Sequence, residues 1–456
     1  MNAALVLSIF VKGFGAVLEF ANQIIITRFG GVALFGTYNL YVSIAEVVCW
    51  VFFSGIVKTN AFYVANGKDI SWFHRRFFLL FALPLILLAA VGGAFYSLVL
   101  SLAFVAAFLY AYQLNLSSIF LACRQYRVSI LGEYVISRVV QLAGFGLLAV
   151  TGNMSAGPLV CVYALGFFVS VLYFTALRSK RVLGSQEMTG GERRRLVRKQ
   201  LTFQLNDVAN GLINQAPVII QYTLSGAFQA GVLSVVLVAR KAISFIAGPT
   251  AKIYLPEFAQ RYVAGDMAGL ARVYRNIVLL QMCFVLPICL LIVGAPGPIL
   301  SIYNSELVGY EGYLRLAAAI FMLTALFGPQ GNLLAMVGQE RVEAITRWLS
   351  LLAMVLVMAV TYGSDLFVLY GIGAQVVVDA GVKLSFVTRL FGGFPLRVSD
   401  WLKLGVPFAA LVCLSAALSC TGLAKLAVVC LFAVLLMVIE LFMFFREEIK
   451  RKLVRR

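Results

Sequence analysis

Long apolar stretches, separated by short polar connections, run through the whole of this sequence. Each is about as long as the roughly 20 residues that a helix needs to cross the hydrocarbon core of a bilayer. Fourteen can be delimited, at 4–27, 34–57, 77–96, 98–121, 128–150, 157–177, 201–224, 229–251, 276–296, 313–336, 342–362, 366–388, 402–420 and 424–445. Charged residues are only 12% of the chain, against about 25% in soluble domains. The sequence predicts an all-α integral membrane protein and excludes a soluble enzyme, a secreted disulfide scaffold and a disordered regulator.

The distribution of positive charge predicts the orientation of these helices. With both termini in the cytoplasm, 29 Lys and Arg residues fall in cytoplasmic connections or the tail, and 3 fall on the opposite side. Arg341 and Arg347 are counted among the cytoplasmic cations, in the tenth connection. Such an excess is the positive-inside pattern, so we expect both termini to be cytoplasmic. The net charge of +18 is then membrane-surface charge, and we expect no nucleic-acid partner.

Cysteine and histidine give no sign of a metal or redox centre. All eight cysteines lie in or beside predicted spans, no CxxC pair occurs, and the single histidine, His74, lies in a predicted loop. Protein metal sites typically use several Cys, His or acidic ligands at short spacing. We therefore expect no cofactor, no metal ion and no histidine proton relay inside the membrane.

Glycines recur at matching places in the two halves of the chain. Gly31 and Gly36, between the first two predicted helices, correspond at an offset of 195 to Gly226 and Gly231. Both halves thus carry G-x4-G at an outer turn. Glycine permits a tight reversal and a close approach of two helices, which is what we predict at both places.

Proline gives a second sign of duplication, because Leu-Pro occurs in the third helix of each half, at Pro84 and at Pro287, where we expect kinks. Both halves begin on the cytoplasmic side, so they are predicted to be parallel repeats. We predict an N-terminal six-helix lobe, a basic cytoplasmic linker, a C-terminal six-helix lobe, and a segment with helices 13 and 14 and a basic tail, at 1–177, 178–200, 201–390 and 391–456.

Three segments resemble the polysaccharide flippases of the multidrug/oligosaccharidyl-lipid/polysaccharide (MOP) exporter superfamily, which move O-antigen or capsule repeat units. They are ITRFGGVALFGTYNLYVSI (26–44), IYLPEFAQRYVAGDMAGL (253–270) and LPICLLIVGAPGPILSIYNSE (286–306). The resemblance implies a V-shaped, alternating-access bundle like that of the MATE transporters. It also implies transport of undecaprenyl-pyrophosphate-linked sugars across the bacterial inner membrane, beside a polysaccharide polymerase machinery. Fourteen helices fit the polysaccharide branch better than the twelve usual in the multidrug branch.

Ten charged side chains are assigned to the interior of the predicted spans. Five are cations and five are acids: Lys12, Arg138, Arg240, Lys241, Lys383, Glu19, Glu46, Glu133, Asp207 and Asp379. Each costs at least about 2.5–3.5 kcal/mol near the bilayer centre, so we do not expect them to face lipid. They are predicted to face a wet cavity or one another.

Two of the predicted helices carry polar stripes. Helical spacing places Lys12, Glu19 and Gln23 on one side of the first helix. It likewise places Asp207, Asn210 and Asn214 on one side of the seventh helix. One explanation is that these helices line a central cavity for sugars. The other is that Lys12–Asp207 and Glu46–Lys241 are neutralising pairs that hold the lobes together. We favour the cavity because uncharged amides accompany the charges.

Arg240 and Lys241 are predicted to bind the pyrophosphate group of the substrate. Their own span supplies no acid, and a guanidinium grips phosphate with two parallel hydrogen bonds. Arg138 is a secondary anion-site candidate. The alternative for Arg240 and Lys241 is pairing to Glu46 or Asp207 without a substrate role.

Acids in the spans are candidates for coupling transport to protons or sodium ions, because a desolvated carboxylate can exchange a proton as a cavity alternates. Glu46, Asp207 and Glu19 are predicted to act in this way. Asp379 and Lys383, spaced i, i+4, are predicted to form a structural pair.

The sequence thus predicts a transporter that flips lipid-linked oligosaccharides from the cytoplasmic to the outer leaflet. A multidrug or cation antiporter of the same fold is an alternative, although it would favour an acid-dominated cavity. A peptidoglycan-precursor flippase is another. A membrane-embedded polysaccharide polymerase is a third, but its catalytic domain would need more room than the longest outer connection, at 297–312.

Overall fold

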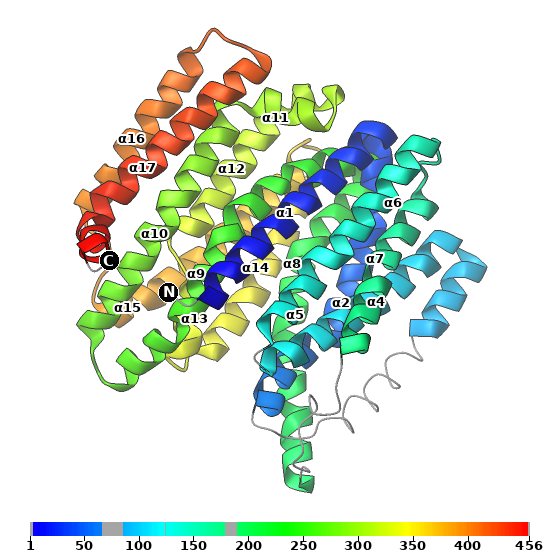
Figure 1. The fold of residues 1–456 in the computed structure, drawn as a ribbon, viewed down its shortest axis with the longest axis horizontal. Coiled ribbons are helices and arrows are strands. Elements are labelled where there is room, and N and C mark those ends of the chain that lie inside the picture. Colours follow the sequence, from blue (N-terminus) through cyan, green and yellow to red (C-terminus); the bar gives the residue numbers. More distant parts are fainter. Residues whose placement is uncertain (1–2, 66–84, 124, 178–188, 455–456) are drawn as a thin grey trace. The chain divides into compact units, whose positions relative to one another are not determined.

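The computed structural model describes residues 3–65, 85–123, 125–177 and 189–454 (Figure 1). The chain divides into two compact units, Met1–Ser234 and Val235–Arg456, which are described separately below. We call them unit 1 and unit 2. The predicted lobe boundaries are a different division, by sequence duplication, and stay a prediction.

Unit 1 is built from helices throughout its described part. They are α1 (Ala3–Gly30), α2 (Val32–Ala65), an unlabelled helix (Leu85–Phe95), α4 (Leu98–Ala122), α5 (Tyr126–Ile130), the π-helix η1 (Leu131–Ile136), α6 (Ser137–Thr151), α7 (Ala156–Leu177) and α8 (Gly190–Val236).

Unit 2 is also helical where it is described. Its elements are α9 (Val238–Val263), α10 (Met267–Gly294), α11 (Pro296–Tyr303), the 3₁₀-helix η3 (Ser305–Tyr310), α12 (Glu311–Leu326), α13 (Gln330–Met336), α14 (Glu340–Val360), α15 (Phe367–Phe391), α16 (Val398–Ala417) and α17 (Gly422–Val454).

The helices confirm a multi-pass membrane protein. Among the described residues, 11 segments are long and apolar enough to cross a bilayer, and one of them, Asp207–Ser244, covers parts of the predicted seventh and eighth stretches. The first predicted stretch lies on α1, and the described part of the third is the helix Leu85–Phe95. Helices suit a bilayer because each satisfies its own backbone hydrogen bonds. Pro84 and its predicted kink lie outside the described residues.

Glycine makes both predicted turns. Gly31, between α1 and α2, has φ +85°, and Gly226, inside the segment labelled α8, has φ +87°, a region that L side chains rarely adopt. Close helix approach is confirmed at the other two glycines. A Cβ atom on Gly36 would strike the carbonyl oxygen of Ala227 and the amide nitrogen of Gly231. The two G-x4-G motifs therefore pack against each other inside unit 1.

In unit 1, α4 packs between α2 and α7. Leu116 and Phe120 of α4 form an apolar cluster with Val171 and Phe174 of α7, and all four are buried. The Phe174 ring also lies where a Cβ of Gly132 would stand. Small residues at such contacts let helices approach closely in a membrane, where van der Waals packing drives association.

In unit 2, α10 is the most buried span and packs against α9, α12, α16 and α17 (Figure 1). Pro287 lies inside α10, and the helix continues past it to Gly294. An ion pair ties α10 to the start of α16: Arg275 donates two hydrogen bonds to the carboxylate of Asp400, at 2.8 and 2.7 Å.

The predicted span 313–336 is wrong as a single helix. The structure ends α12 at Leu326 and starts α13 at Gln330. Gly328 between them has φ +71°, and Pro329 has no backbone N–H to continue the helical pattern. The break borders the pocket described below.

Candidate functional site

One of the predicted cations in unit 1 has an acid partner. Arg138 Nη2 of α6 lies 3.5 Å from Glu19 Oε2 of α1, and both side chains are about a quarter exposed. Arg138 Nη1 also donates to Gln141 Oε1 at 3.0 Å, and Gln141 donates to the Tyr163 carbonyl at 3.1 Å. The sequence did not predict this pairing. It compensates both charges, so Arg138 stays only a predicted contact for an anion.

Glu46 of α2 lies in a hydrogen-bonded group that joins three helices of unit 1. Gln215 Nε2 of α8 donates to Glu46 Oε2, and Tyr163 OH of α7 donates to Glu46 Oε1 at 3.5 Å. Ser43 Oγ donates to Gln215 Oε1 at 3.1 Å. Gln215 and Tyr163 are neutral donors, so these two hydrogen bonds stabilise the Glu46 carboxylate without compensating its charge.

The other predicted polar side chains of unit 1 lie on α1 and α8. Lys12 Nζ stands 5.0 Å from the centre of the Tyr134 ring, a cation–π contact. Asp207 is 8% exposed, and Asn210 and Asn214 follow it on the same face of α8. Within the part of the chain that the structure describes, the buried atoms Gln23 Oε1 and Asn214 Oδ1 have no hydrogen-bond partner. These stripes stay candidates for contact with a polar substrate.

A second buried polar group in unit 1 surrounds Glu133, to which the sequence assigned no role. Glu133 lies in the π-helix η1 and accepts a hydrogen bond from Ser117 Oγ at 2.6 Å. Ser117 is also 2.8 Å from Ser129 Oγ, and Gln113 donates to the Gly132 carbonyl at 3.0 Å. From the π-helix, Glu133 thus reaches one hydroxyl group on α4, that of Ser117, a contact that i, i+4 spacing does not predict.

In unit 2, the guanidinium of Arg240 has no carboxylate partner in the described part of the chain. Its Cζ lies 6.0 Å from the centre of the Phe321 ring, and the Arg347 cation acts on it electrostatically. The side chain is only partly exposed, while the neighbouring Lys241 is exposed. A partly buried guanidinium next to a second cation favours a bound anion.

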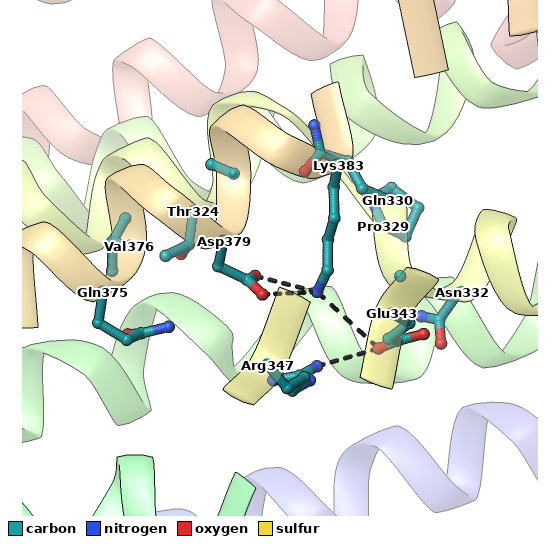
Figure 2. A pocket seen from close by; sticks show the side chains of 13 residues that line it. Thr324, Pro329, Gln330, Asn332, Glu343, Arg347, Gln375, Val376, Asp379 and Lys383 are labelled. Atoms are coloured by element: carbon teal, nitrogen blue, oxygen red, sulfur yellow. Dashed lines mark hydrogen bonds and ion pairs between the residues drawn. The ribbon is translucent and has the colours of Figure 1, made fainter. Parts of the chain in front are cut away.

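A polar pocket of about 220 Å³ lies in unit 2 beside the break between α12 and α13 (Figure 2). Figure 2 shows the Lys383 ammonium between two carboxylates, 2.8 Å from Asp379 Oδ1 and 3.9 Å from Glu343 Oε1. Arg347 donates to the same Glu343 oxygen at 3.2 Å. The predicted Asp379–Lys383 pair is confirmed, as one half of a four-residue ionic group.

The sequence prediction missed Glu343 and Arg347. Arg347 was assigned to a cytoplasmic connection, but it lies in α14 within a candidate span. Its i, i+4 spacing from Glu343 is the signal that could have found the pair. Glu440 of α17 was also left out of the intramembrane acids; it is fully buried, and neither carboxylate oxygen has a hydrogen-bond partner. The expected balance of five acids and five cations is therefore wrong.

Metal ligands do not gather in the described residues, where no group of three or more His, Cys, Asp or Glu side chains could hold an ion.

Comparison with known proteins places the fold. None of the protein-family models matches the sequence, and no curated protein matches it. Solved structures of MOP superfamily transporters do match the fold. The chain is similar to the lipid II flippase MurJ in an inward closed conformation, with 12% identity, a TM-score of 0.73, and coverage of 97% of this chain and 100% of that one.

Two further structures extend the similarity. One is a multidrug-resistance MATE family transporter of the MOP superfamily in an inward-facing conformation, with 12% identity, a TM-score of 0.64 and coverage of 87% and 95%. The other is a MOP superfamily transporter from Pyrococcus furiosus, with 11% identity, a TM-score of 0.60 and coverage of 90% and 96%. At such identities the likeness shows the fold, which is that of MOP superfamily transporters and flippases.

Proposed function

We propose that this protein flips an undecaprenyl-pyrophosphate-linked oligosaccharide, of the kind used for O-antigen or capsule repeat units, from the cytoplasmic to the outer leaflet of a bacterial inner membrane. The observation that carries the proposal is Arg240, a partly buried intramembrane guanidinium without a described acid partner. A pyrophosphate group supplies two or more charges for such a group to bind. The fold supports the proposal, since one protein that shares it is a lipid II flippase.

In this proposal Arg240 and Lys241 contact the pyrophosphate, and Arg138 and Lys12 are further cationic candidates. The amides Asn210, Asn214 and Gln23 contact sugar hydroxyls, because an amide both donates and accepts hydrogen bonds. Gln23 Oε1 and Asn214 Oδ1, buried without a partner, support that role.

Glu46, Asp207 and Glu19 are the proposed coupling acids for proton or sodium exchange. The position of Glu46 in a hydrogen-bonded group with Gln215 and Tyr163 supports its part in this proposal. Transport assays with imposed pH and sodium gradients test the proposal. Rates that respond to neither gradient would leave these acids with a structural role only.

A cation or multidrug antiporter is the second candidate, because MATE transporters share the fold. Cationic drugs bind at acidic side chains, whereas the positive charges of Arg240 and Arg347 would repel them. Binding of a cationic dye that competes with lipid-linked saccharide, or replaces it, would favour the antiporter.

A gene deletion tests the flippase in the cell. Lipid-linked repeat units are expected to accumulate in the cytoplasmic leaflet, where enzymes added to the outside of spheroplasts do not reach them. We further propose that both termini are cytoplasmic and that a polysaccharide polymerase receives the product. Repeat units that stay accessible from outside in the deletion strain would contradict the proposal.

A further inference from the structure

The pocket of unit 2 is lined by neutral hydrogen-bonding side chains as well as by charges. Gln330 and Asn332 reach it from α13, Gln375 from α15 and Thr324 from α12 (Figure 2). All four come from candidate membrane spans or their ends, where polar side chains are rare. The break at Gly328 brings the α13 amides to the cavity.

Three of these amides have polar atoms without a hydrogen-bond partner in the described part of the chain. Gln330 is 5% exposed, and its Nε2 has no hydrogen-bond acceptor. Asn332 and Gln375 make no side-chain hydrogen bond in the described part of the chain. Gln330 is buried, and an unpaired buried amide group costs about 1–3 kcal/mol. This group and the half-buried amides of Asn332 and Gln375 beside it favour a polar occupant of the cavity.

The ionic groups in the pocket compensate one another. Lys383 lies between Asp379 and Glu343, and Arg347 also pairs with Glu343, which gives two cations and two acids. A phosphate would find no surplus of positive charge here, unlike at Arg240. A metal cation would have to displace Lys383, which is only 3% exposed. The pocket therefore suits an uncharged ligand with several hydroxyl groups.

The size of the cavity limits that ligand. A volume of about 220 Å³ is below the roughly 300–1,000 Å³ of pockets that hold drug-sized molecules. It suits one sugar ring and not a whole repeat unit.

We infer that this pocket, bordered by Asn332, Gln375 and the Lys383–Asp379 pair, binds a single neutral sugar ring of the transported saccharide. The inference rests on the proposed function and adds a saccharide site in unit 2 to the predicted pyrophosphate contact at Arg240, since Arg347 both lines the pocket and acts electrostatically on Arg240. The amides donate to and accept from sugar hydroxyls, while the carboxylate oxygens of Asp379 accept. Gly331 leaves room for the Glu343 carboxylate, since a Cβ there would lie 2.6 Å from Glu343 Oε1.

The test uses the full chain in lipid nanodiscs and saturation-transfer NMR. The probes are free glucose, galactose and N-acetylglucosamine, with inorganic pyrophosphate as a separate probe. Gln375→Ala and Asn332→Ala are each expected to weaken saccharide binding about 3- to 10-fold, the effect of one lost hydrogen bond. The double variant is expected to abolish the signal. The control is Val377→Ala, on the same helix with a side chain 60% exposed, which should leave binding unchanged.

Melting midpoints separate binding from a structural role. Because Asn332 and Gln375 have no partner in the described protein, their alanine variants should melt like the wild type. Pyrophosphate binding should survive in both and fall in Arg240→Ala. Saccharide binding that is unchanged in the double variant, or absent for every sugar with the wild type, would overturn the inference.

The same preparation distinguishes this inference from the proposed function. Saccharide binding that depends on Asn332 and Gln375, in a protein that moves no lipid-linked saccharide in proteoliposomes, would keep the sugar site and refute the flippase. Transport of lipid-linked saccharide at the wild-type rate by the double variant would refute the sugar site and keep the flippase.

Discussion

Gly36 packs directly on the backbone of Gly231, and a Cβ atom added to Gly36 would lie 2.6 Å from the Gly231 amide nitrogen. The contact joins the start of α2 to the end of α8, within unit 1. Each glycine belongs to one copy of a motif that recurs 195 residues apart. Each motif thus supplies a residue without a side chain where the backbone of the other motif comes close.

Gly36→Ala should therefore destabilise the protein. The added methyl group meets backbone atoms, which cannot rotate away, and overpacking of this kind costs about 1–3 kcal/mol. Thermal melting in detergent, followed by tryptophan fluorescence, measures the change. Gly146→Ala in α6 is the matched control, because a Cβ there meets nothing within 4 Å. Equal melting midpoints for the two variants would contradict the backbone contact.

The Glu19–Arg138 pair should show thermodynamic coupling. Each side chain is less than a third exposed, so removing one partner leaves the other charge poorly solvated. We expect Glu19→Gln and Arg138→Met each to lower the free energy of unfolding by up to about 3 kcal/mol, and the double variant to lose less than their sum. A coupling energy of about 0.5–3 kcal/mol is expected from the cycle. Strictly additive effects would show that the two side chains do not interact.

The Arg275–Asp400 ion pair should contribute more to the free energy of unfolding than the exposed ion pairs of unit 2 do. Asp400 is 3% exposed, and it also accepts from the Arg397 backbone N–H at 3.0 Å, capping α16. Asp400→Ala loses both interactions and should cost about 1–3 kcal/mol, whereas Asp400→Asn keeps a cap and should cost less.

The control for this prediction is Glu311→Gln. Its ion pair with Arg315 is 35% and 51% exposed, so a cost below about 1 kcal/mol is expected. Melting curves of the three variants, measured side by side, compare these losses of stability. A Glu311 variant as unstable as Asp400→Ala would contradict the burial argument.

Substitution of Arg240 should lower the transport rate without impairing folding. Arg240→Ala is expected to reach normal membrane levels and to lower the flipping rate at least about tenfold, because charge-assisted hydrogen bonds contribute about 1.5–3 kcal/mol. Arg240→Lys should keep part of the activity, since an ammonium is a point charge that cannot grip phosphate in two places. Arg272→Ala, an exposed cation on α10, is the control and should transport normally. Full transport by Arg240→Ala would remove Arg240 from the site.

Local rules predicted those features that depend on one residue type at one place. The turn glycines Gly31 and Gly226 were predictable because a tight reversal needs φ above zero, and both have it. The Asp379–Lys383 pair followed from helical spacing alone. The break at Gly328 was missed because its neighbours are apolar enough to read as one continuous span.

Tertiary relationships could not be predicted in the same way. Glu343 meets Lys383 only because α14 packs against α15, and no pattern within either helix states that contact. Arg347 was counted in a connection although the predicted span 342–362 contains it. Glu19 and Arg138 are 119 residues apart, and their contact depends on how α1 packs on α6.

The most direct test of the account measures lipid-linked saccharide movement in proteoliposomes. Undecaprenyl-pyrophosphate carrying a fluorescent saccharide is placed in both leaflets, and a membrane-impermeant quencher is added outside. If the wild-type protein flips the lipid, quenching should proceed beyond the fraction of fluorophore in the outer leaflet. With Arg240→Ala, quenching should stop at that fraction. Quenching by the wild type that stops where empty liposomes stop, under imposed pH and sodium gradients, would contradict it.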